Sequence, residues 1–423
     1  MARCFSFEKA ISNNETSCKE VRIMNEKHYN GYKSYSYLRA NKDYKQYELS
    51  YDLDRVPAYT LDLTDCEKEK LNNILTNDFI VSLRDHGFIV PNKHEDILPY
   101  CRELHTAFHY EGLSMSGIDI IFENFMDGIS NITSKTGLKW DDVIYLLGMR
   151  YADIARQDTV YIASSYEDLL KSKGNKQIAI LPSLEAASIV ENEIDRVDIL
   201  YGFGIRCMGI TYNEANTLGS GLVEKRDGGL TNFGRRVVER MNTLGMMIDI
   251  SHCGDQTSLD VIETSNHPVF ITHAGARALW NTPRMKSDHV LKACAEKGGI
   301  IGVCAAPNTT LTKNSAKHSL QSVMEHFEYI AALVGIDHVG LGPDTFFGDH
   351  VALQHAYDEM LGISASHSGE VFVESSYVEG LENPAEAMKN MIGWLVKKNY
   401  PSKEIAKAAG ENAMRVINRI LTH

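Results

Sequence analysis

Side chains able to bind a metal ion follow several apolar stretches of this sequence. His252 ends the segment MMIDISH and His273 ends PVFITH, so each stands where an apolar run finishes. Glu185 comes directly after QIAILPSL, and Asp344 ends DHVGLGPD. Imidazole and carboxylate groups are the usual ligands of catalytic zinc. Two histidines and two acids from four apolar runs therefore predict a metal centre, if the fold brings the ends of those runs together.

The segment FIVSLRDHGFIVP, residues 79–91, also contains an apolar run followed by polar residues, but these include an arginine. Side chains two apart on a strand share a face, so Arg84 and His86 are predicted to point the same way as Ser82. A shift by one residue would instead present Leu83 and Asp85. Arginine stays protonated and cannot bind zinc. This strand end therefore offers one candidate ligand, His86, next to a fixed positive charge.

Eight short apolar segments alternate with amphipathic stretches, which predicts a (β/α)8 barrel in which the strand ends meet at one mouth. A doubly wound parallel sheet is the alternative. The clearest helix is predicted after Thr231, which is a good N-cap, and is expected to stop at Gly245. The predicted strands are DFIVSL, GIDIIF, QIAILPSL, RCMGITY, MMIDIS, PVFITH, GIIGVC and DHVGLG.

Residues 1–75 differ from the barrel that we predict over residues 76–423. The first part has few aliphatic runs and many tyrosines, so it cannot form a large core alone. We expect it to lie over the barrel or a partner subunit as a lid or interface arm, although an inert extension is an equal alternative. The tyrosines are Tyr29, Tyr32, Tyr35, Tyr37, Tyr44, Tyr47, Tyr51 and Tyr59.

Composition restricts the partners of this protein. The chain has 423 residues and a net charge of −13, which argues against nucleic acid and against an anionic membrane surface as partners. No apolar run is long enough for a spanning helix, and the first residues lack a signal-peptide core, so a cytoplasmic protein is expected. Eight cysteines without a C-x-x-C spacing are expected to be reduced thiols.

Several longer segments resemble the membrane (renal) dipeptidase family, peptidase family M19, a branch of the amidohydrolase-like metal hydrolases. The resemblance is dense over about residues 176–420, looser over 76–175, and does not cover the first 75. It implies a (β/α)8 barrel with a two-zinc site that cleaves dipeptides, and it suggests a homodimer. The segments, in family order, are GLTNFGRRVVERMNTLGMMIDISH, HPVFITHAGARAL, PRMKSDHVL, EKGGIIGV, DHVGLGPD and GENAMRVI.

The same resemblance assigns roles to individual residues. Glu185 matches a glutamate that bridges two metal ions, and His252 and His273 match histidines that bind the second ion. Arg284 matches an arginine that holds the substrate carboxylate. Asp344 matches an aspartate that contacts the substrate amino group.

Three positions depart from the family pattern. The family's first strand ends in H-x-D, which binds the first metal, whereas this chain has Arg84 and His86 there. Tyr212 stands where the family has a histidine that polarises the scissile carbonyl. The family's D-F-D after the last strand reads Asp344-Thr345-Phe346, so the second acid is absent. The first metal site is therefore predicted to be lost or weakened.

These observations lead to a hypothesis of one divalent ion, zinc, bound by Glu185, His252 and His273, with His86 as a candidate fourth ligand. Asp344 is then predicted to be the general base. The reaction is hydrolysis of a dipeptide or a dipeptide-like small amide with a free carboxylate.

The remaining roles concern the substrate. Tyr212 is predicted to donate to the carbonyl oxygen, and Arg284 to anchor the carboxylate. Arg84 is predicted to hold an anionic substrate group or the oxyanion. Alternatively, Arg84 only pairs with Asp85 or Glu185.

Two other functions stay open from the sequence. One is a one-metal lyase or decarboxylase acting on a small carboxylic acid, because related barrels carry such chemistry. The other is a non-catalytic descendant that binds a small molecule or a partner.

Overall fold

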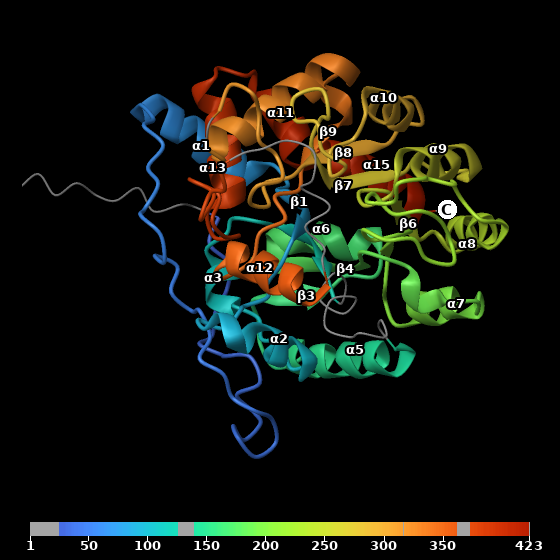
Figure 1. Cartoon of the computed structure of the whole chain (residues 1–423). Coiled ribbons are helices and arrows are strands. Elements are labelled where there is room, and N and C mark those ends of the chain that lie inside the picture. The colour runs from blue at the N-terminus through green and yellow to red at the C-terminus, as the bar shows by residue number, and fades with distance from the viewer. Residues whose placement is uncertain (1–24, 126–138, 316, 362–372, 423) are drawn as a thin grey trace, which may run out of the picture.

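The chain folds as a closed parallel β-barrel surrounded by helices, as the sequence predicts (Figure 1). In this computed structural model, the described residues are 25–125, 139–315, 317–361 and 373–422. The strand order is β2-β1-β9-β8-β7-β6-β5-β4, and a β2–β4 pairing closes the ring. The ninth strand, β3, pairs with β4 outside this ring. All pairings are parallel, so the carboxyl ends of eight strands meet at one mouth.

All eight predicted strands are confirmed, whereas β3 was not predicted. The strands are β1 Val81–Asp85, β2 Ile120–Asn124, β3 Val160–Ile162, β4 Ile178–Leu184, β5 Cys207–Gly209, β6 Met247–Asp249, β7 Phe270–Ala274, β8 Ile300–Val303 and β9 Val339–Leu341.

The helices of the described residues cover the outside of the barrel. They are α1 Asp65–Asn77, α2 His94–Arg102, α3 Tyr110–Ser114, α5 Trp140–Ile154, α6 Tyr166–Asn175, α7 Asp195–Gly202, α8 Asn232–Leu244, α9 Asp255–Thr264, α10 Asp288–Glu296, α11 Leu320–Val334, α12 His350–Leu361, α13 Ala387–Lys397, α14 Ser402–Ala406 and α15 Asn412–Leu421.

Helix α8 shows how local sequence fixes these elements. The Thr231 side chain accepts a hydrogen bond from Gly234 N, which caps the first turn as predicted. The helix stops at Gly245, whose φ of 71° is left-handed and favours glycine. Val237 and Met241 are fully buried on the inner face. The helix therefore begins, ends and packs where its sequence pattern indicates.

Helix α15 closes the end of the barrel opposite the mouth. Its apolar residues Val416 and Ile417 share one buried cluster with Leu83, Phe122 and Phe270 of the barrel interior. The carbonyl of Ile420 lies close to Gly245, immediately before β6. With this end filled by apolar side chains, the mouth is the place where polar groups gather.

The amino-terminal arm, here residues 25–64, lies over the barrel. The carboxylate of Asp153, a buried residue of α5, anchors it by accepting hydrogen bonds from Tyr32 Oη at 2.7 Å and from Tyr35 N at 2.6 Å. It also accepts from Ser34 Oγ and from Tyr110 Oη of the barrel domain. This part of the arm is therefore hydrogen-bonded to the barrel domain.

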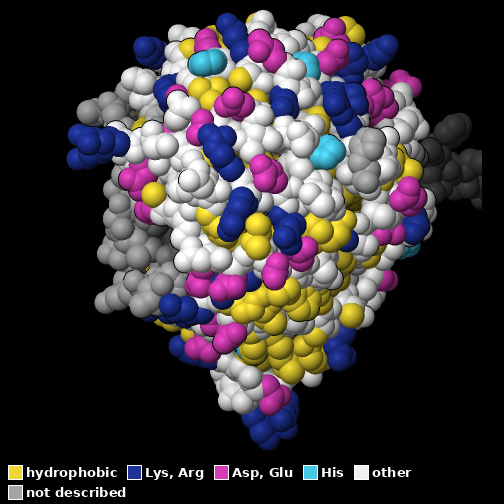
Figure 2. All heavy atoms as spheres, turned by 90° about the vertical axis from the view of Figure 1, so that its right-hand side faces the viewer, with side chains coloured by type: hydrophobic (Ala, Val, Ile, Leu, Met, Phe, Trp, Pro, Cys, Tyr) yellow, Lys and Arg dark blue, Asp and Glu magenta, His cyan; other side chains and the backbone are white. Residues whose placement is uncertain are grey.

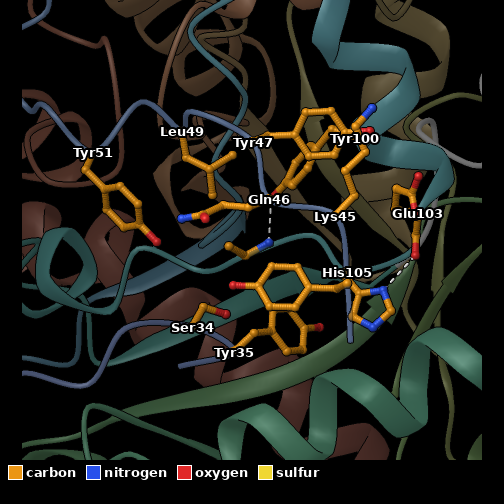
Figure 3. A pocket seen from close by; sticks show the side chains of 12 residues that line it. Ser34, Tyr35, Lys45, Gln46, Tyr47, Leu49, Tyr51, Tyr100, Glu103 and His105 are labelled. Atoms are coloured by element: carbon orange, nitrogen blue, oxygen red, sulfur yellow. Dashed lines mark hydrogen bonds between the residues drawn. The ribbon is translucent and has the colours of Figure 1, made fainter. Parts of the chain in front are cut away.

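A small pocket lies between the arm and the segment around α2 (Figure 3). Residues of the arm, four of them tyrosines, line most of it, and Tyr100, Glu103, His105 and Ala107 complete the wall. Tyr47 packs edge-on against Tyr100 with ring centroids 5.4 Å apart. These rings bury apolar area at the contact between arm and barrel.

No helix among the described residues is long and apolar enough to cross a membrane. Six cysteines lie in this part of the chain, and all of them are free thiols, as expected. Cys4 and Cys18 lie outside the described residues.

Candidate active site

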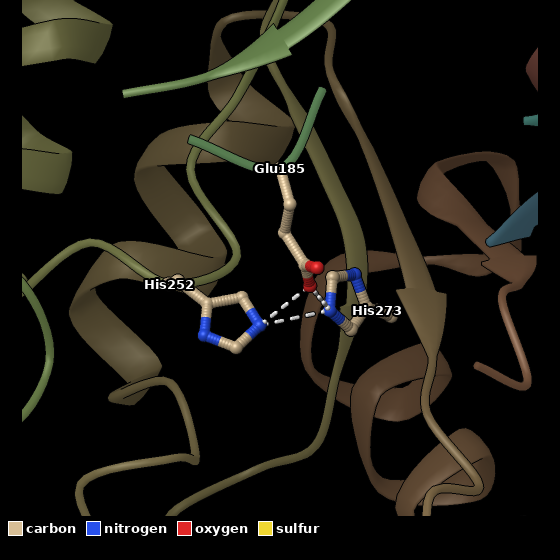
Figure 4. Close-up of side chains that lie close together, drawn as sticks. All are labelled: Glu185, His252 and His273. Carbon is tan, nitrogen blue, oxygen red and sulfur yellow. Dashed lines mark hydrogen bonds and ion pairs between the residues drawn. The ribbon is translucent and has the colours of Figure 1, made fainter. Parts of the chain in front are cut away.

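Three predicted metal ligands meet at the mouth of the barrel (Figure 4). Oε1 of Glu185 lies 2.9 Å from Nε2 of His252 and 2.9 Å from Nε2 of His273. The two imidazole nitrogens are 3.0 Å apart. All three side chains are buried, and they are the only His, Cys, Asp or Glu group of this kind among the described residues. The prediction that these strand ends converge is confirmed.

Glu185 is held by close packing at the end of β4. Gly209, the last residue of β5, approaches so closely that a Cβ there would lie 1.8 Å from the Glu185 carbonyl oxygen. The second carboxylate oxygen accepts a hydrogen bond of 2.9 Å from Asn124 Nδ2, at the end of β2. Burial alone would raise the pKa of Glu185, but His252, His273 and Arg84 lower it well below its usual range. The side chain is therefore an ionised ligand.

His252 is oriented by two neighbours. Its Nδ1 lies 3.1 Å from Asn213 Oδ1, so Nε2 faces the cluster. The ring of Tyr212 stacks on the imidazole with centroids 4.4 Å apart and an angle of 15°. Burial, together with Arg284, lowers the pKa of His252 to about 4. The imidazole is therefore neutral near pH 7, as a metal ligand must be.

His273 is oriented by a chain of hydrogen bonds that ends on a buried acid. Its Nδ1 lies 2.7 Å from Thr272 Oγ1, which in turn donates to Asp249 Oδ2 at 2.6 Å. Such partners fix the direction in which the other ring nitrogen points. Nε2 of His273 accordingly faces Glu185 and His252.

The cluster fits a small divalent ion. Ligands that are about 2.0–2.1 Å from a tetrahedral zinc lie about 3.3 Å from one another, close to the spacing of these three atoms. The donors are two imidazoles and one carboxylate, a ligand set that would suit a catalytic zinc ion. Glu185, His252 and His273 are thus the residues that can hold such an ion.

Arg84 lies inside the barrel beneath this cluster. Its side chain is fully buried, with Nη2 3.3 Å from Asp249 Oδ2 and Nη1 donating to Ser183 Oγ at 3.1 Å. The structure gives Arg84 an ion pair with Asp249. The predicted direct contact of Arg84 with a substrate anion is therefore corrected to an internal role, which includes lowering the pKa of Glu185.

The irregular register of β1 explains why the positions of some side chains were predicted incorrectly. The prediction assumed that side chains alternate strictly between the two faces of the strand. The pairing of β1 with β2 shifts between Ser82 and Asp85. Ser82 Oγ donates to the carboxylate of Asp85 at 2.8 Å, while Arg84 reaches Asp249 inside the barrel. Thr345 also donates to Asp85 through its amide and its hydroxyl. Asp85 is thus occupied away from the metal ligands.

His86 and Asp344 form a separate pair beside the cluster. His86 Nε2 lies 3.2 Å from Asp344 Oδ1, and His86 Nδ1 lies 4.0 Å from Oε1 of the buried Glu123. Burial alone would lower the pKa of His86, but Asp344 and Glu123 raise it. The other oxygen, Asp344 Oδ2, is 3.9 Å from His273 Nε2. The structure does not bring His86 into the three-ligand cluster, which corrects its prediction as a fourth ligand.

Arg284 is a buried cation with free hydrogen-bonding capacity. The residue is 4% exposed, and neither Nη1 nor Nη2 has a hydrogen-bond partner in the described part of the chain. It is close enough to His252 and Tyr212 to shift the pKa of both. An unpaired buried guanidinium is costly, so this arrangement indicates a site for an anionic ligand group.

Comparisons with known proteins agree with this geometry. Residues 148–358 match the family described as membrane dipeptidase (peptidase family M19). A protein from the pqqA 5′ region of Klebsiella pneumoniae is 31% identical over 208 residues, which cover 47% of this chain and 75% of that protein. The chain belongs to the membrane dipeptidase family.

Two further comparisons cover a larger part of this family member. Dipeptidase tcpJ of Claviceps purpurea is 23% identical over 299 residues, 70% of this chain but 63% of that relative. A crystal structure of an amidohydrolase from Pseudomonas aeruginosa superimposes with a TM-score of 0.67 at 25% identity, covering 84% of this chain and 99% of that one. The family member is a dipeptidase-like hydrolase on an amidohydrolase-type barrel.

Within this dipeptidase-family site, sequence analysis missed several supporting residues. Asp249 and Glu123 lie within β6 and β2, where they read as parts of apolar strands. The available signal was an acid inside an apolar run, which requires a buried partner. Asn213 and Asn124 gave no such signal. At the position of the family's second acid, Phe346 packs edge-on against Phe88, with centroids 5.8 Å apart.

Proposed function

We propose that this member of the membrane dipeptidase family hydrolyses a dipeptide, or a dipeptide-like small amide with a free carboxylate, with one zinc ion. The observation that carries the proposal is the convergence of Glu185, His252 and His273 within hydrogen-bonding distance of one another. Support also comes from a relative whose name is dipeptidase tcpJ. Support for a single ion is that Arg84 and His86 lie outside the three-residue cluster.

The residues around the cluster have different roles in the proposed hydrolysis. A bound zinc ion supplies a Lewis acid and brings the pKa of a coordinated water to about 7. Asp344 takes a proton from the attacking water through Oδ2, which faces the cluster at 3.9 Å from His273, and passes it to the leaving nitrogen. His273 and His86 hold the pKa of Asp344 well below its usual range against the effect of burial, so the carboxylate is ionised.

The substrate is oriented by two further side chains. Burial and nearby Glu185 raise the pKa of Tyr212 well above its ordinary value, so its hydroxyl stays protonated and donates to the scissile carbonyl oxygen. Losing one such donor typically costs about 10²–10³ in rate. The unpartnered guanidinium of Arg284 holds the free carboxylate with two parallel hydrogen bonds. The substrate is thus fixed at both ends of the bond that breaks.

A panel of substrates tests this proposal. Purified enzyme with zinc is incubated with dipeptides, N-acyl amino acids and small carboxylic acids, and the products are identified by mass spectrometry. We expect cleavage of amide bonds next to a free carboxylate. Loss of carbon dioxide from the small acids, without amide cleavage, would contradict hydrolysis and support the one-metal lyase instead.

The homodimer and the cytoplasmic location stay predictions. Figure 2 shows hydrophobic side chains gathered on the lower part of one face, on the side of the molecule where α7 lies. Ile199 and Phe203 are among the exposed large hydrophobic residues, at 45% and 42% exposure. Light scattering of purified protein measures the oligomeric state, and substitution of Ile199 and Phe203 by serine tests whether this surface contributes.

A further inference from the structure

One oxygen of Asp344 is engaged by His86, and the other faces the metal-ligand cluster. Oδ1 lies 3.2 Å from Nε2 of His86, and Oδ2 faces the metal ligands, 3.9 Å from His273 Nε2 and 4.0 Å from Cys304 Sγ. The backbone is fixed as well, because Asp344 N donates to Arg84 O at 2.8 Å. A substrate amino group would therefore have to compete with His86 for Asp344 Oδ1.

His86 is itself held in place. Its backbone N–H donates to Thr345 O at 2.9 Å, and its Nδ1 edge faces the buried carboxylate of Glu123. Glu123 is fixed in turn, since its Oε2 accepts a 2.7 Å hydrogen bond from Gly87 N. The imidazole therefore lies between two carboxylates, one on each side. A substrate cannot easily displace it from Asp344.

The other acids in contact with the site are occupied too. Asp249 is bound to Arg84, Glu185 belongs to the ligand cluster, and Asp85 accepts from Ser82 and Thr345. The free oxygen of Glu123 is buried behind the His86 ring. A substrate ammonium group next to the scissile carbonyl would meet an imidazole N–H donor where it needs an acceptor. Burying an ammonium without a partner is strongly unfavourable.

We propose that His86 excludes substrates with a free α-amino group, so that the preferred substrate is an N-acylated amino acid. This inference rests on the proposed hydrolase function and specifies its substrate class. The carboxylate of the leaving amino acid binds Arg284, as it would in a dipeptide. The acyl side is uncharged and needs no acceptor. Water adds to the acyl carbon, the C–N bond breaks, and the nitrogen receives the proton, which gives a carboxylate and a free amino acid.

A matched pair of substrates isolates the amino group. Alanyl-leucine and propionyl-leucine differ only in that the first has an α-ammonium group, and both are tested with L- and D-leucine. With the zinc-loaded enzyme, we expect kcat/KM for propionyl-leucine to exceed that for alanyl-leucine by about tenfold or more, the equivalent of one unmade charged hydrogen bond. The ratio of the two values does not depend on the fraction of active enzyme.

Two variants link the preference to His86. His86→Ala frees Asp344 Oδ1, so the ratio should move toward alanyl-leucine by about tenfold or more. His86→Gln provides a second variant if the alanine variant folds poorly. The control is His338→Gln, since His338 lies just before β9 at the other end of the barrel, with its Nδ1 3.0 Å from Gly299 O. The control should leave the ratio unchanged.

The possible results separate the two proposals. If the native enzyme cleaves alanyl-leucine as well as propionyl-leucine, the inference about His86 is overturned while the hydrolase function stands. The same holds if His86→Ala leaves the ratio unchanged. Cleavage of neither amide by zinc-loaded protein overturns the proposed function, and the inference with it.

Discussion

The guanidinium of Arg84 and the carboxylate of Asp249 form a fully buried ion pair, with 3.3 Å between Nη2 and Oδ2. Asp249 also accepts hydrogen bonds from Ser251 and Thr272, and Thr272 orients the metal ligand His273. Burial alone would raise the pKa of Asp249, but His273 and Arg84 lower it. The buried charge of Arg84 therefore supports, through Asp249 and Thr272, the orientation of His273 in the cluster.

Removing Arg84 should leave Asp249 as an unpaired buried charge. We expect Arg84→Met to lower the free energy of unfolding by about 3 kcal/mol, within the usual range for breaking a buried pair. Urea unfolding measures this change. The double variant Arg84→Met, Asp249→Asn should recover part of the loss, because the unpaired charge is gone.

The matched control for Arg84 is an exposed arginine in an ion pair. Arg39 pairs with Asp43 at 2.8 Å, but its side chain is 66% exposed. Arg39→Met should change stability much less than Arg84→Met, because solvent screens an exposed ion pair. An effect of Arg84→Met as small as this control would show that the buried pair is not structurally important.

The ligand cluster predicts metal content directly. We expect metal analysis of the purified protein to find one tightly bound divalent ion per chain. His252→Ala and His273→Ala should each lose the ion and the activity, because only two protein ligands then remain. His355→Ala is the control, since His355 is about half exposed and pairs with Glu374 far along the chain from the cluster. Two tightly bound ions in the native protein would contradict the one-metal proposal.

Arg284 should determine the requirement for a free carboxylate. Arg284→Lys keeps the charge but loses the two-pronged geometry, so we expect KM to rise about tenfold or more with a smaller change in kcat. The control is a substrate analogue, the corresponding carboxamide, which lacks the negative charge. The native enzyme should strongly prefer the acid, and Arg284→Ala should largely lose that preference. An unchanged preference would place the carboxylate elsewhere.

Much of the barrel could be predicted because its strands are buried on both faces. Each strand then reads as a short apolar run, and the residue after it faces the mouth, which identified Glu185, His252 and His273. Strand β3 was missed because it has three residues, of which only Val160 is buried. It pairs outside the closed ring, so its sequence was not constrained to be apolar.

The partners of Arg84 and His86 could not be predicted because they depend on contacts between distant strands. Arg84 pairs with an acid 165 residues away, and the register shift in β1 decides which side chains enter the barrel. Period-two reasoning assumes a regular strand, and β1 is irregular between Ser82 and Asp85. The sequence drew attention to Arg84 and His86 at this strand end but could not show which groups they contact.

Asp85 predicts a dependence of stability on pH. Burial raises its pKa to about 7, although hydrogen bonds from Thr345 and Ser82 oppose this. Because the folded protein holds this proton more tightly than the unfolded chain, the contribution of Asp85 to stability is fully present below the unfolded pKa of about 3.9. It falls as pH rises toward and through 7.

Replacing Asp85 by asparagine removes this ionisation and keeps an oxygen that accepts from Thr345. Relative to the native protein, Asp85→Asn should gain roughly 2–3 kcal/mol of unfolding free energy between pH 5 and pH 8. Chemical unfolding at the two pH values measures this difference. Asp43→Asn is the control, because its partner Arg39 lowers the pKa of Asp43 to about 2, so the group is ionised at both values. An equal effect of Asp85→Asn at pH 5 and pH 8 would show that Asp85 is already ionised at the lower pH.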